Sequence, residues 1–384
     1  MPPILLAALF ISVQDTTRPP ELPVSLLQSA DSIAATEFAK DSLGSMTVGI
    51  VAGPNLVWSK SYGFADRGRT RPANAATVYR VASVTKQFTA VMLLQLVERG
   101  SVRLTDPVDK YLPQVRKIPS EKPVVAAPTL LQLATMTSGL ARDPDDKRRS
   151  ESGAPSRWKE VLIEALPMTR YARAPGTGYG YSNIGYSILG AALSHAAGEE
   201  YVVYQRRHIL SPLGMVSSGF ELTPAMRGHL AEGVDYDELH RDTLNYEDAS
   251  LDHKNGLGLR VPGGGLYSTV GDIAKMVALA MGYAPVTVIR PETLKIRDNV
   301  GVASARRLDY GYGLGYQVIR WADTVAVGHS GNLAGYTSMI LYDTERKFGV
   351  IVLRSAAGGN ADAGRLGGRI FRKITSMLPR KTGG

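Results

Sequence analysis

The sequence predicts a two-part fold, α/β plus all-α: an antiparallel β-sheet built from both chain ends and flanked by helices, with an inserted helical region. Three observations predict it. Strand-like runs gather near the two ends of the 384-residue chain, helix-like runs fill the middle, and no segment repeats. With 44% hydrophobic residues, a chain of this length can bury a large core.

The N-terminal part predicts a helix followed by a hairpin. A helical pattern covers about residues 25–40 and is followed by "MTVGIVAGPNLVWSKSYGFAD", residues 46–66. Gly53, Pro54 and Asn55 are turn formers between two runs rich in β-branched and aromatic side chains. We therefore expect two antiparallel strands here.

The middle of the chain is predicted to be helical. Most of its apolar runs end at a glycine, which is a common helix stop. The runs cover 85–100, 129–139, 158–167, 183–198 and 270–282. The polar stretch 221–253, rich in Asp, Glu and His, is interpreted as a long loop.

The C-terminal part predicts the remaining strands and a last helix. Strand-like runs separated by glycine or charged turns are followed by a helix-compatible segment. The strands cover 313–321, 325–331, 335–343 and 347–355, and the helix 362–378. We therefore expect one domain over 22–380, with an α/β region from 22–80 and 306–380 and the helical insertion over 81–305.

An apolar run near the start of the chain predicts export. Residues 4–13, "ILLAALFISV", are too few to span a bilayer but suffice for the hydrophobic part of a secretory signal. We expect a signal peptide over 1–16, no stable membrane span, and a periplasmic or secreted protein. An N-terminal helix or a misplaced start is the alternative, because no Lys or Arg precedes the run.

Composition narrows the chemistry. Cysteine is absent, which excludes disulfides, thiol nucleophiles and thiolate metal sites. The net charge of +9 is scattered over the chain and follows no single helix, so a solvated basic surface is favoured over nucleic-acid binding.

No metal site is predicted either. Acidic and histidine side chains crowd one stretch without regular spacing, which favours a polar loop: His240, Asp242, Asp248, Asp252 and His253. The glycines at 263–265 have no phosphate-binding lysine, so they are interpreted as a close-packed wall.

The stretch "YRVASVTKQFTA", residues 79–90, places Ser83 three residues before Lys86 at the start of a helical run. The spacing puts both side chains on one helix face, where a neutral lysine could take the hydroxyl proton. The first helical turn also offers unpaired N–H groups for an oxyanion. Ser156 and Lys159 share the spacing, but Glu160 follows at once and favours a solvated helix face.

Two later stretches carry further candidates. "PGTGYGYSNIGYSILG" places Tyr181 and Asn183 in a glycine-rich loop before an apolar helix, although Asn183 could simply cap that helix. "VGHSGNLAGYTS" places His329, Ser330 and Gly331 at the end of a predicted strand. Alone, that stretch is typical of a turn.

In this order the three stretches resemble the serine β-lactamase and penicillin-binding-protein superfamily, in its class C-like branch with D-Ala-D-Ala carboxypeptidases and class VIII-type esterases. The segments "LVERGSVRLTDPVDKYLP", "LATMTSGL", "ILSPLGM" and "VPGGGLYSTVGDIAKM" look like further landmarks of that family. The resemblance covers nearly the whole chain after the leader. It implies the β-lactamase/transpeptidase-like fold.

The resemblance also implies roles for the candidate residues. Ser83 would be the acylated nucleophile, Lys86 its general base, Tyr181 the acid/base that passes the proton to the leaving group, and Asn183 a substrate-orienting amide. The oxyanion hole would be formed by the backbone N–H groups of Ser83 and Asn332.

The third motif would bind substrate. His329, Ser330 and Gly331 would form it on the edge strand of the site. The partner implied is a small-molecule or peptide acyl substrate, and no cofactor is needed.

Two departures from the family pattern bear on function. Met136 stands where many relatives carry His, which we expect to affect packing. His329 replaces the lysine common in class C β-lactamases, and a histidine of ordinary pKa is mostly neutral at pH 7. The sequence therefore favours a peptidase or esterase. A true β-lactamase and an inactive cell-wall-peptide binding protein are the alternatives.

Overall fold

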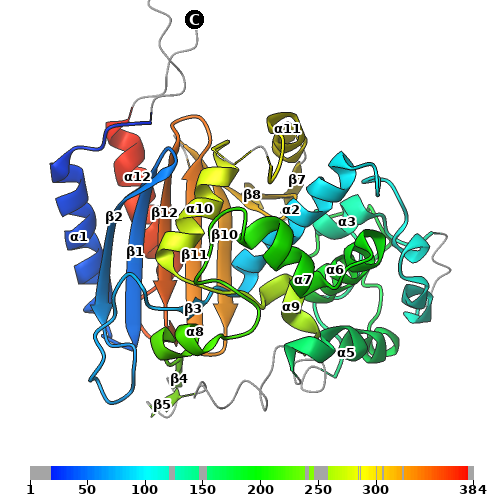
Figure 1. Cartoon of the computed structure of the whole chain (residues 1–384), viewed down its shortest axis with the longest axis horizontal. Helices are drawn as coiled ribbons and strands as arrows, with labels where there is room; N and C mark the ends of the chain where they lie inside the picture. The colour runs from blue at the N-terminus through cyan, green and yellow to red at the C-terminus, as the bar shows by residue number, and fades with distance from the viewer. Residues whose placement is uncertain are drawn as a thin grey trace, which may run out of the picture.

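The computed structural model describes residues 19–120, 126–146, 154–237, 242–245, 258–283, 285, 287–299, 301–304, 307–321 and 324–378. Its main element is an eight-stranded sheet (Figure 1). In spatial order the strands are β2 (Asn55–Gly63), β1 (Ser45–Ala52), β12 (Phe348–Arg354), β11 (Tyr336–Asp343), β10 (Val325–Leu333), β9 (Gln317–Arg320), β8 (Arg307–Gly313) and β7 (Gly301–Ser304). Every neighbouring pair is antiparallel.

The sheet joins the two ends of the chain. β1 and β2 form the predicted hairpin, and β1 pairs with β12 along its length, from Met46 opposite Arg354 to Ala52 opposite Phe348. The expected antiparallel sheet from both chain ends is therefore confirmed.

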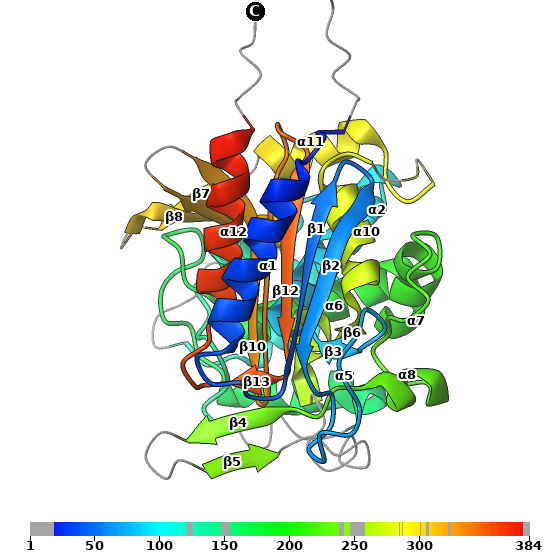
Figure 2. The ribbon, with the colours of Figure 1, turned by 90° about the vertical axis from the view of Figure 1, so that its left-hand side faces the viewer.

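Strand alternation divides the core into two layers. Because successive side chains of a strand point to opposite faces, Val48 and Ile50 of β1 lie in one apolar cluster, whereas Val51 lies in the other. The first cluster is covered by α1 (Val24–Phe38) and α12 (Ala363–Met377). Figure 2 shows these two helices side by side over the same face of the sheet.

The opposite face is covered by α10 (Val270–Ala280), which contacts β1, β2 and β12. Glycines make this close approach possible. A Cβ atom at Gly49 would lie 2.6 Å from Val270 Cγ2, and one at Gly349 would lie 2.5 Å from Val277 Cγ1. Both distances are shorter than van der Waals contact, so side chains at these positions would displace the helix.

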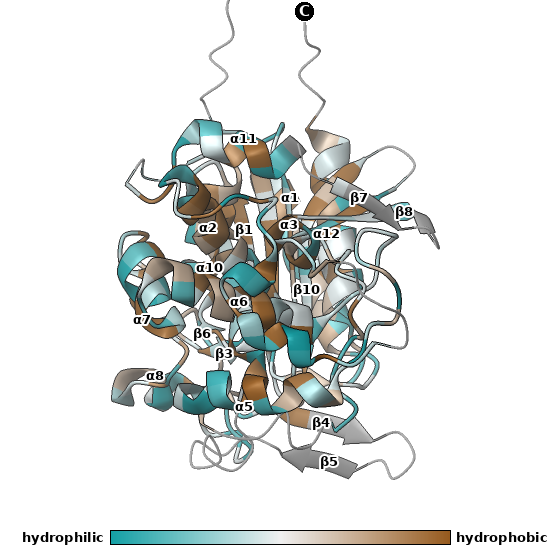
Figure 3. Cartoon of the chain, turned by 90° about the vertical axis from the view of Figure 1, so that its right-hand side faces the viewer, coloured by the Kyte–Doolittle hydropathy of each residue, from teal (hydrophilic) through white to brown (hydrophobic). Residues whose placement is uncertain are grey.

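Most of the remaining helices that the structure describes form the second part of the molecule. They are α2 (Thr85–Glu98), α3 (Leu130–Ala134), α5 (Trp158–Ala165), α6 (Asn183–Ala197), α7 (Tyr201–Gln205), α9 (Val261–Gly264) and α11 (Pro291–Asn299). α2 is buried along nearly all of its length and contacts α6 and α9. The hydropathy colouring of the ribbon in Figure 3 shows brown, hydrophobic residues along α2. A helix buried on all sides has no polar face, which explains its near-continuous apolar sequence.

The structure adds elements that the sequence did not indicate. β7 and β8 extend the sheet at its edge. The stretch 221–253, expected to be a loop, contains α8 (Pro224–His229), β4 (Val234–Asp237) and β5 (Asp242–Asn245). The division into an α/β region (22–80 and 306–380) and a helical insertion (81–305) stays a prediction. Two elements of the range 81–305 lie with the sheet: α10 packs on its face, and β7 is its edge strand.

Candidate active site

Ser83 lies in a tight turn between the sheet side and the helical side of the molecule. β3 (Tyr79–Arg80) leads into a 3-10 turn, Ala82–Val84, which continues directly into α2. Ala82 has a φ of 48°, a left-handed conformation that is costly for a residue with a side chain. Ala82 and Val84 are buried, while Ser83 between them is only half-buried. The turn therefore presents the Ser83 hydroxyl to the surface of the site.

β10 passes directly beside this turn. A Cβ atom at Gly331 would lie 2.4 Å from Val81 O and 3.1 Å from the Ala82 Cβ, so only glycine allows the approach. Ser338 Oγ also donates to Val81 O, at 2.9 Å. The strand that carries the expected third motif is thereby held against the residues that precede Ser83.

Lys86 lies beneath Ser83 and is fully buried. Its Nζ is 3.2 Å from Ser83 Oγ, 3.1 Å from Asn183 Oδ1 and 2.7 Å from Gly263 O. Burial lowers the pKa of Lys86 well below its ordinary value, and the nearby Arg260 and Arg142 lower it further. A neutral amine can donate to Asn183 Oδ1 and Gly263 O and accept the proton of the Ser83 hydroxyl. These contacts are those expected of a general base.

Tyr181 and Asn183 reach the same point from the start of α6. The Ser182 hydroxyl accepts from Gly185 N at 3.0 Å and caps the helix, so capping does not occupy Asn183. The ring of Tyr181 has its centroid 5.1 Å from Lys86 Nζ. Burial raises the pKa of Tyr181, and a hydrogen bond to Ser83 only partly offsets this. Its phenol therefore carries a proton at neutral pH.

Met136 helps to position this loop. It is buried, and its Sδ accepts a hydrogen bond from Ser182 N at 3.2 Å. The contact fixes the residue between Tyr181 and Asn183, in keeping with the expectation that Met136 matters for packing.

His329 lies behind Lys86 and is completely buried. Its Nδ1 donates to Ser330 O at 2.6 Å, and Tyr312 Oη lies 2.9 Å from its Nε2. Burial, and then the nearby Lys86, lower the pKa of His329 to about 3. This differs from the ordinary histidine pKa expected from the sequence: the imidazole is neutral throughout the physiological range and does not open to the pocket.

A pocket of about 500 Å³ opens in front of Ser83. Among the predicted residues, Ser83, Asn183 and Asn332 line it, whereas Lys86 and His329 form the layer behind. Its full lining is Ala82, Ser83, Arg142, Asp143, Asn183, Arg260, Gly263, Gly264, Asn332, Leu333, Ala334 and Ala357. The glycines at 263 and 264 thus form a wall of the site, as the sequence suggested.

Three charged residues of this pocket were missed by the sequence analysis. They are Arg142, Asp143 and Arg260. Asp143 Oδ1 accepts from Asn183 Nδ2 at 2.9 Å and from Arg260 Nη2 at 3.2 Å. No sequence motif marks these residues, since their relation depends on two loops that are distant in the chain.

Comparison with known proteins defines the family. A family model described as Beta-lactamase matches residues 30–373. The chain belongs to the beta-lactamase family. This beta-lactamase family chain is 31% identical over 223 residues to the D-alanyl-D-alanine-carboxypeptidase/endopeptidase AmpH of Escherichia coli, covering 55% of this chain and 52% of AmpH. It spans about half the length of the curated relatives it matches.

Two solved structures show the same fold as this beta-lactamase family chain. The octameric penicillin-binding protein homologue from Pyrococcus abyssi has a TM-score of 0.75 at 23% identity, over 91% of this chain and 77% of that chain. The D-alanine carboxypeptidase AmpC from Burkholderia cenocepacia has a TM-score of 0.72 at 20% identity, over 91% and 99%. The predicted β-lactamase/transpeptidase-like fold is confirmed.

The second Ser-x-x-Lys pair, Ser156 and Lys159, lies outside the pocket at Ser83. Ser156 is exposed, and Lys159 lies on α5 with its Nζ 3.9 Å from Glu200 Oε1. Lys159 therefore has the solvated setting that its neighbours in the sequence indicated.

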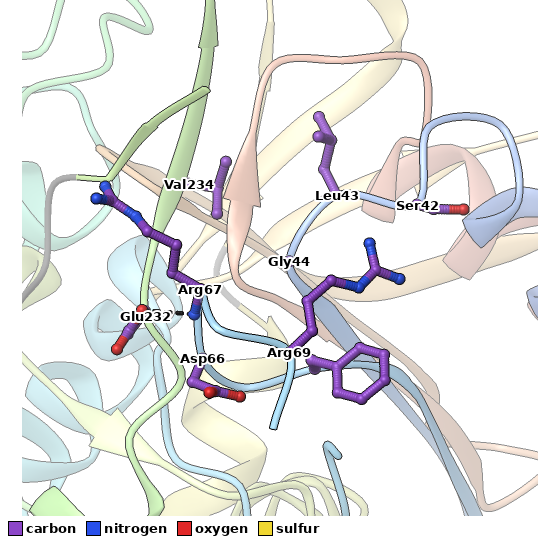
Figure 4. Close-up of a pocket in the computed structure, with 9 residues that line it drawn as sticks. Ser42, Leu43, Gly44, Asp66, Arg67, Arg69, Glu232 and Val234 are labelled. Atoms are coloured by element: carbon purple, nitrogen blue, oxygen red, sulfur yellow. Dashed lines mark hydrogen bonds between the residues drawn. The ribbon is translucent and has the colours of Figure 1, made fainter. Parts of the chain in front are cut away.

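A second pocket has a volume of about 170 Å³. It lies where the loop after β2 meets the residues at the start of β4. Figure 4 shows Arg67, Arg69 and Glu232 around it, with Glu232 accepting from Arg67 N at 2.7 Å. Its lining contains no paired nucleophile and base. A hydroxyl paired with a buried amine lies instead at the pocket of Ser83, where Lys86 Nζ is 3.2 Å from Ser83 Oγ.

Within the described part of the chain, no group of three His, Asp or Glu side chains could hold a metal ion. His240, Asp248, Asp252 and His253 lie outside the described residues. The helices that the structure describes include none with the length and hydropathy needed to cross a membrane.

Proposed function

We propose that this chain is a serine hydrolase that acts on an amide or ester through an acyl-enzyme on Ser83. The observation that carries the proposal is the buried Lys86 amine, 3.2 Å from Ser83 Oγ and with its pKa lowered well below the ordinary value. A lowered pKa increases the fraction of the neutral amine, which is the form that can take the hydroxyl proton. Family membership and the relatives named as carboxypeptidases support the same reaction class.

Acylation would use the residues in this order. Lys86 takes the Ser83 proton while Oγ attacks the acyl carbonyl, and the N–H groups of Ser83 and Asn332 stabilise the oxyanion. Tyr181 gives its proton to the leaving group and recovers it from Lys86. Water then attacks the ester on Ser83, its proton passes to the same pair, and Ser83 regains its hydroxyl proton as the acid leaves.

We place the substrate among small-molecule or peptide acyl compounds of the bacterial envelope. The name of the Escherichia coli relative, a D-alanyl-D-alanine carboxypeptidase, supports a D-amino-acid peptide, and the neutral His329 in place of a lysine supports a peptidase or esterase over a β-lactamase. Export, with a signal peptide over 1–16 and a periplasmic or secreted location, rests on the apolar run at residues 4–13. Residues 1–18 lie outside the described part of the structure.

The test combines covalent labelling with a substrate panel. Intact mass measurement should show one fluorophosphonate adduct on the wild-type chain and none on Ser83→Ala. An adduct on Ser83→Ala would mean that another residue is the nucleophile, and no adduct on the wild type would favour an inactive binding protein. Turnover of an N-acyl-D-Ala-D-Ala peptide, a chromogenic cephalosporin and p-nitrophenyl esters then identifies the acyl class.

A further inference from the structure

The lining of the catalytic pocket carries an excess of positive charge. Its charged side chains among the described residues are Arg142, Arg260 and Asp143, two guanidiniums against one carboxylate. Lys86 and His329 are fully buried behind the lining and do not belong to it. The excess charge therefore comes from the arginines.

The two arginines have different surroundings. The side chain of Arg260, on the 3-10 turn Gly258–Arg260, is 17% exposed, and its Nη2 is 3.2 Å from Asp143 Oδ1. The side chain of Arg142 is 68% exposed, with its Nε 3.5 Å from Asp143 Oδ2. Asp143 thus pairs closely with Arg260, while most of the Arg142 side chain is exposed at the lining of the pocket.

Arg142 is also fixed in place. Its backbone O accepts from Asn183 N at 2.7 Å, and the preceding Ala141 O accepts from Ser182 Oγ at 2.7 Å. Its guanidinium carbon lies 4.9 Å from the centroid of the Tyr181 ring. A cation whose backbone is held by the loop before α6 and whose guanidinium lies over the Tyr181 ring is partly preorganised, so less conformational entropy is lost when an anion binds to it.

We propose that Arg142 binds an anionic group, a carboxylate, of the substrate beside Ser83. The inference rests on the proposed hydrolase function and names its substrate class: acyl compounds that carry a free carboxylate. Arg142 is then a specificity-determining residue, and Asp143 positions it by pairing with its Nε and with Asn183. His329 is buried behind the pocket lining, so its side chain does not reach a carboxylate of the substrate in the pocket.

Matched substrate pairs test the proposal. One pair is an N-acyl-D-Ala-D-Ala peptide and its C-terminal amide, with the charge on the leaving side. The other is the p-nitrophenyl monoester of glutarate and its methyl ester, with the charge on the acyl side. The measured quantity is the ratio of kcat/KM for the anionic and neutral member of a pair, because lost packing on Tyr181 would lower both values alike.

Arg142→Gln should lower this ratio about fivefold in at least one pair, as expected for one partly solvated ion pair. Arg142→Lys, which keeps the charge, should retain the ratio within about twofold. Arg157→Gln is the matched control: Arg157 is also largely exposed and paired with a carboxylate, that of Glu160, but it lies outside the pocket. In the wild type, added salt should lower the ratio.

An unchanged ratio in both pairs for Arg142→Gln would overturn the inference while leaving the hydrolase function intact. For a pair that is not turned over, the ratio is taken from the concentrations that halve the rate of Ser83 labelling by the fluorophosphonate. Absence of any Ser83 adduct on the wild type would instead overturn the proposed function, and the inference with it.

Discussion

Lys86 lies where a charged ammonium is costly. It is fully buried, with two arginines near enough to lower its pKa, and its Nζ contacts Ser83, Asn183 and Gly263. The same burial that lowers the pKa also keeps the Lys86 amine away from solvent. Lysine at this position is therefore explained by its environment, whereas Lys159 of the second pair has an ordinary solvated setting.

The first prediction compares the two lysines. Lys86→Ala should lower kcat/KM for any hydrolysed substrate by about a hundredfold or more, because an unassisted hydroxyl is a weak nucleophile. Lys159→Ala should stay within about threefold of the wild type. Steady-state kinetics on a p-nitrophenyl ester measure both. A large loss in Lys159→Ala would show that Ser156 and Lys159 form the reactive pair.

The second prediction concerns His329 and acid stability. Its pKa is about 3 in the folded protein and about 6.5 in an unfolded chain, so between these values the unfolded state binds the extra proton. Stability is therefore lost as the pH falls through this window. At pH 4.5 this residue alone should cost about 2 to 3 kcal/mol relative to pH 7.5.

Urea unfolding of the wild type and His329→Gln at both pH values measures the effect. The pH-dependent loss should be smaller in His329→Gln by that amount, while His195→Gln, which changes an exposed histidine, should keep the wild-type loss. Equal losses in the wild type and His329→Gln would show that the imidazole is not held neutral.

At the scale of elements, the contact between α10 and the sheet depends on two glycines. Gly49 of β1 and Gly349 of β12 lie under Val270 and Val277, where a Cβ atom would overlap a valine methyl group. α10 follows directly after β6 (Tyr267–Ser268), which pairs with β3 just before Ser83. A displacement of α10 would therefore reach the turn that carries Ser83.

Gly349→Val should destabilise the chain by about 2 kcal/mol or more, because the added side chain overpacks this contact. Gly228→Ala is the control, since Gly228 lies in α8 with no neighbouring atom within 4 Å of a Cβ atom there. It should be neutral or slightly stabilising. Urea unfolding of the wild type and both variants measures the free energies of unfolding. If Gly349→Val has the same free energy of unfolding as the wild type, the close packing of α10 on β12 is contradicted.

The sequence predicted the elements that have clear local patterns. β10, β11 and β12 come from apolar runs rich in β-branched residues, and α2 and α6 end near glycines. β8 was missed because glycines interrupt its run "RLDYGYG". Because β8 was not predicted, the contact between His329 and Tyr312 of that strand could not be predicted either. The burial of His329 was therefore missed.

The same limit applies to the site. Ser83, Lys86, Tyr181 and Asn183 follow recognisable spacings within short segments, whereas Arg142 and Arg260 meet at Asp143 only through tertiary structure. Their role in the pocket could not be derived from either segment alone.

At the scale of the whole molecule, the site needs both chain ends. Ser83 follows the N-terminal hairpin, and the strand beside it, β10, is held in the sheet by β11 and, through it, by β12. A chain that ends at residue 343 should therefore fail to react with a fluorophosphonate, although it retains every proposed catalytic side chain. A chain that ends at residue 378 should react like the full chain. Labelling of the shorter chain would show that β12 is dispensable for the site.

The pairing of β1 with β12 also governs the order of events during synthesis. β1 leaves the ribosome early, but its partner emerges only after more than three quarters of the chain has been made. Until then one side of β1 has open backbone donors and acceptors, which favour pairing with other nascent chains. Contacts of such long sequence separation also slow folding. We therefore expect the N-terminal hairpin to need protection until translation is nearly finished, and the sheet beside Ser83 to be complete only after β12 has paired with β1.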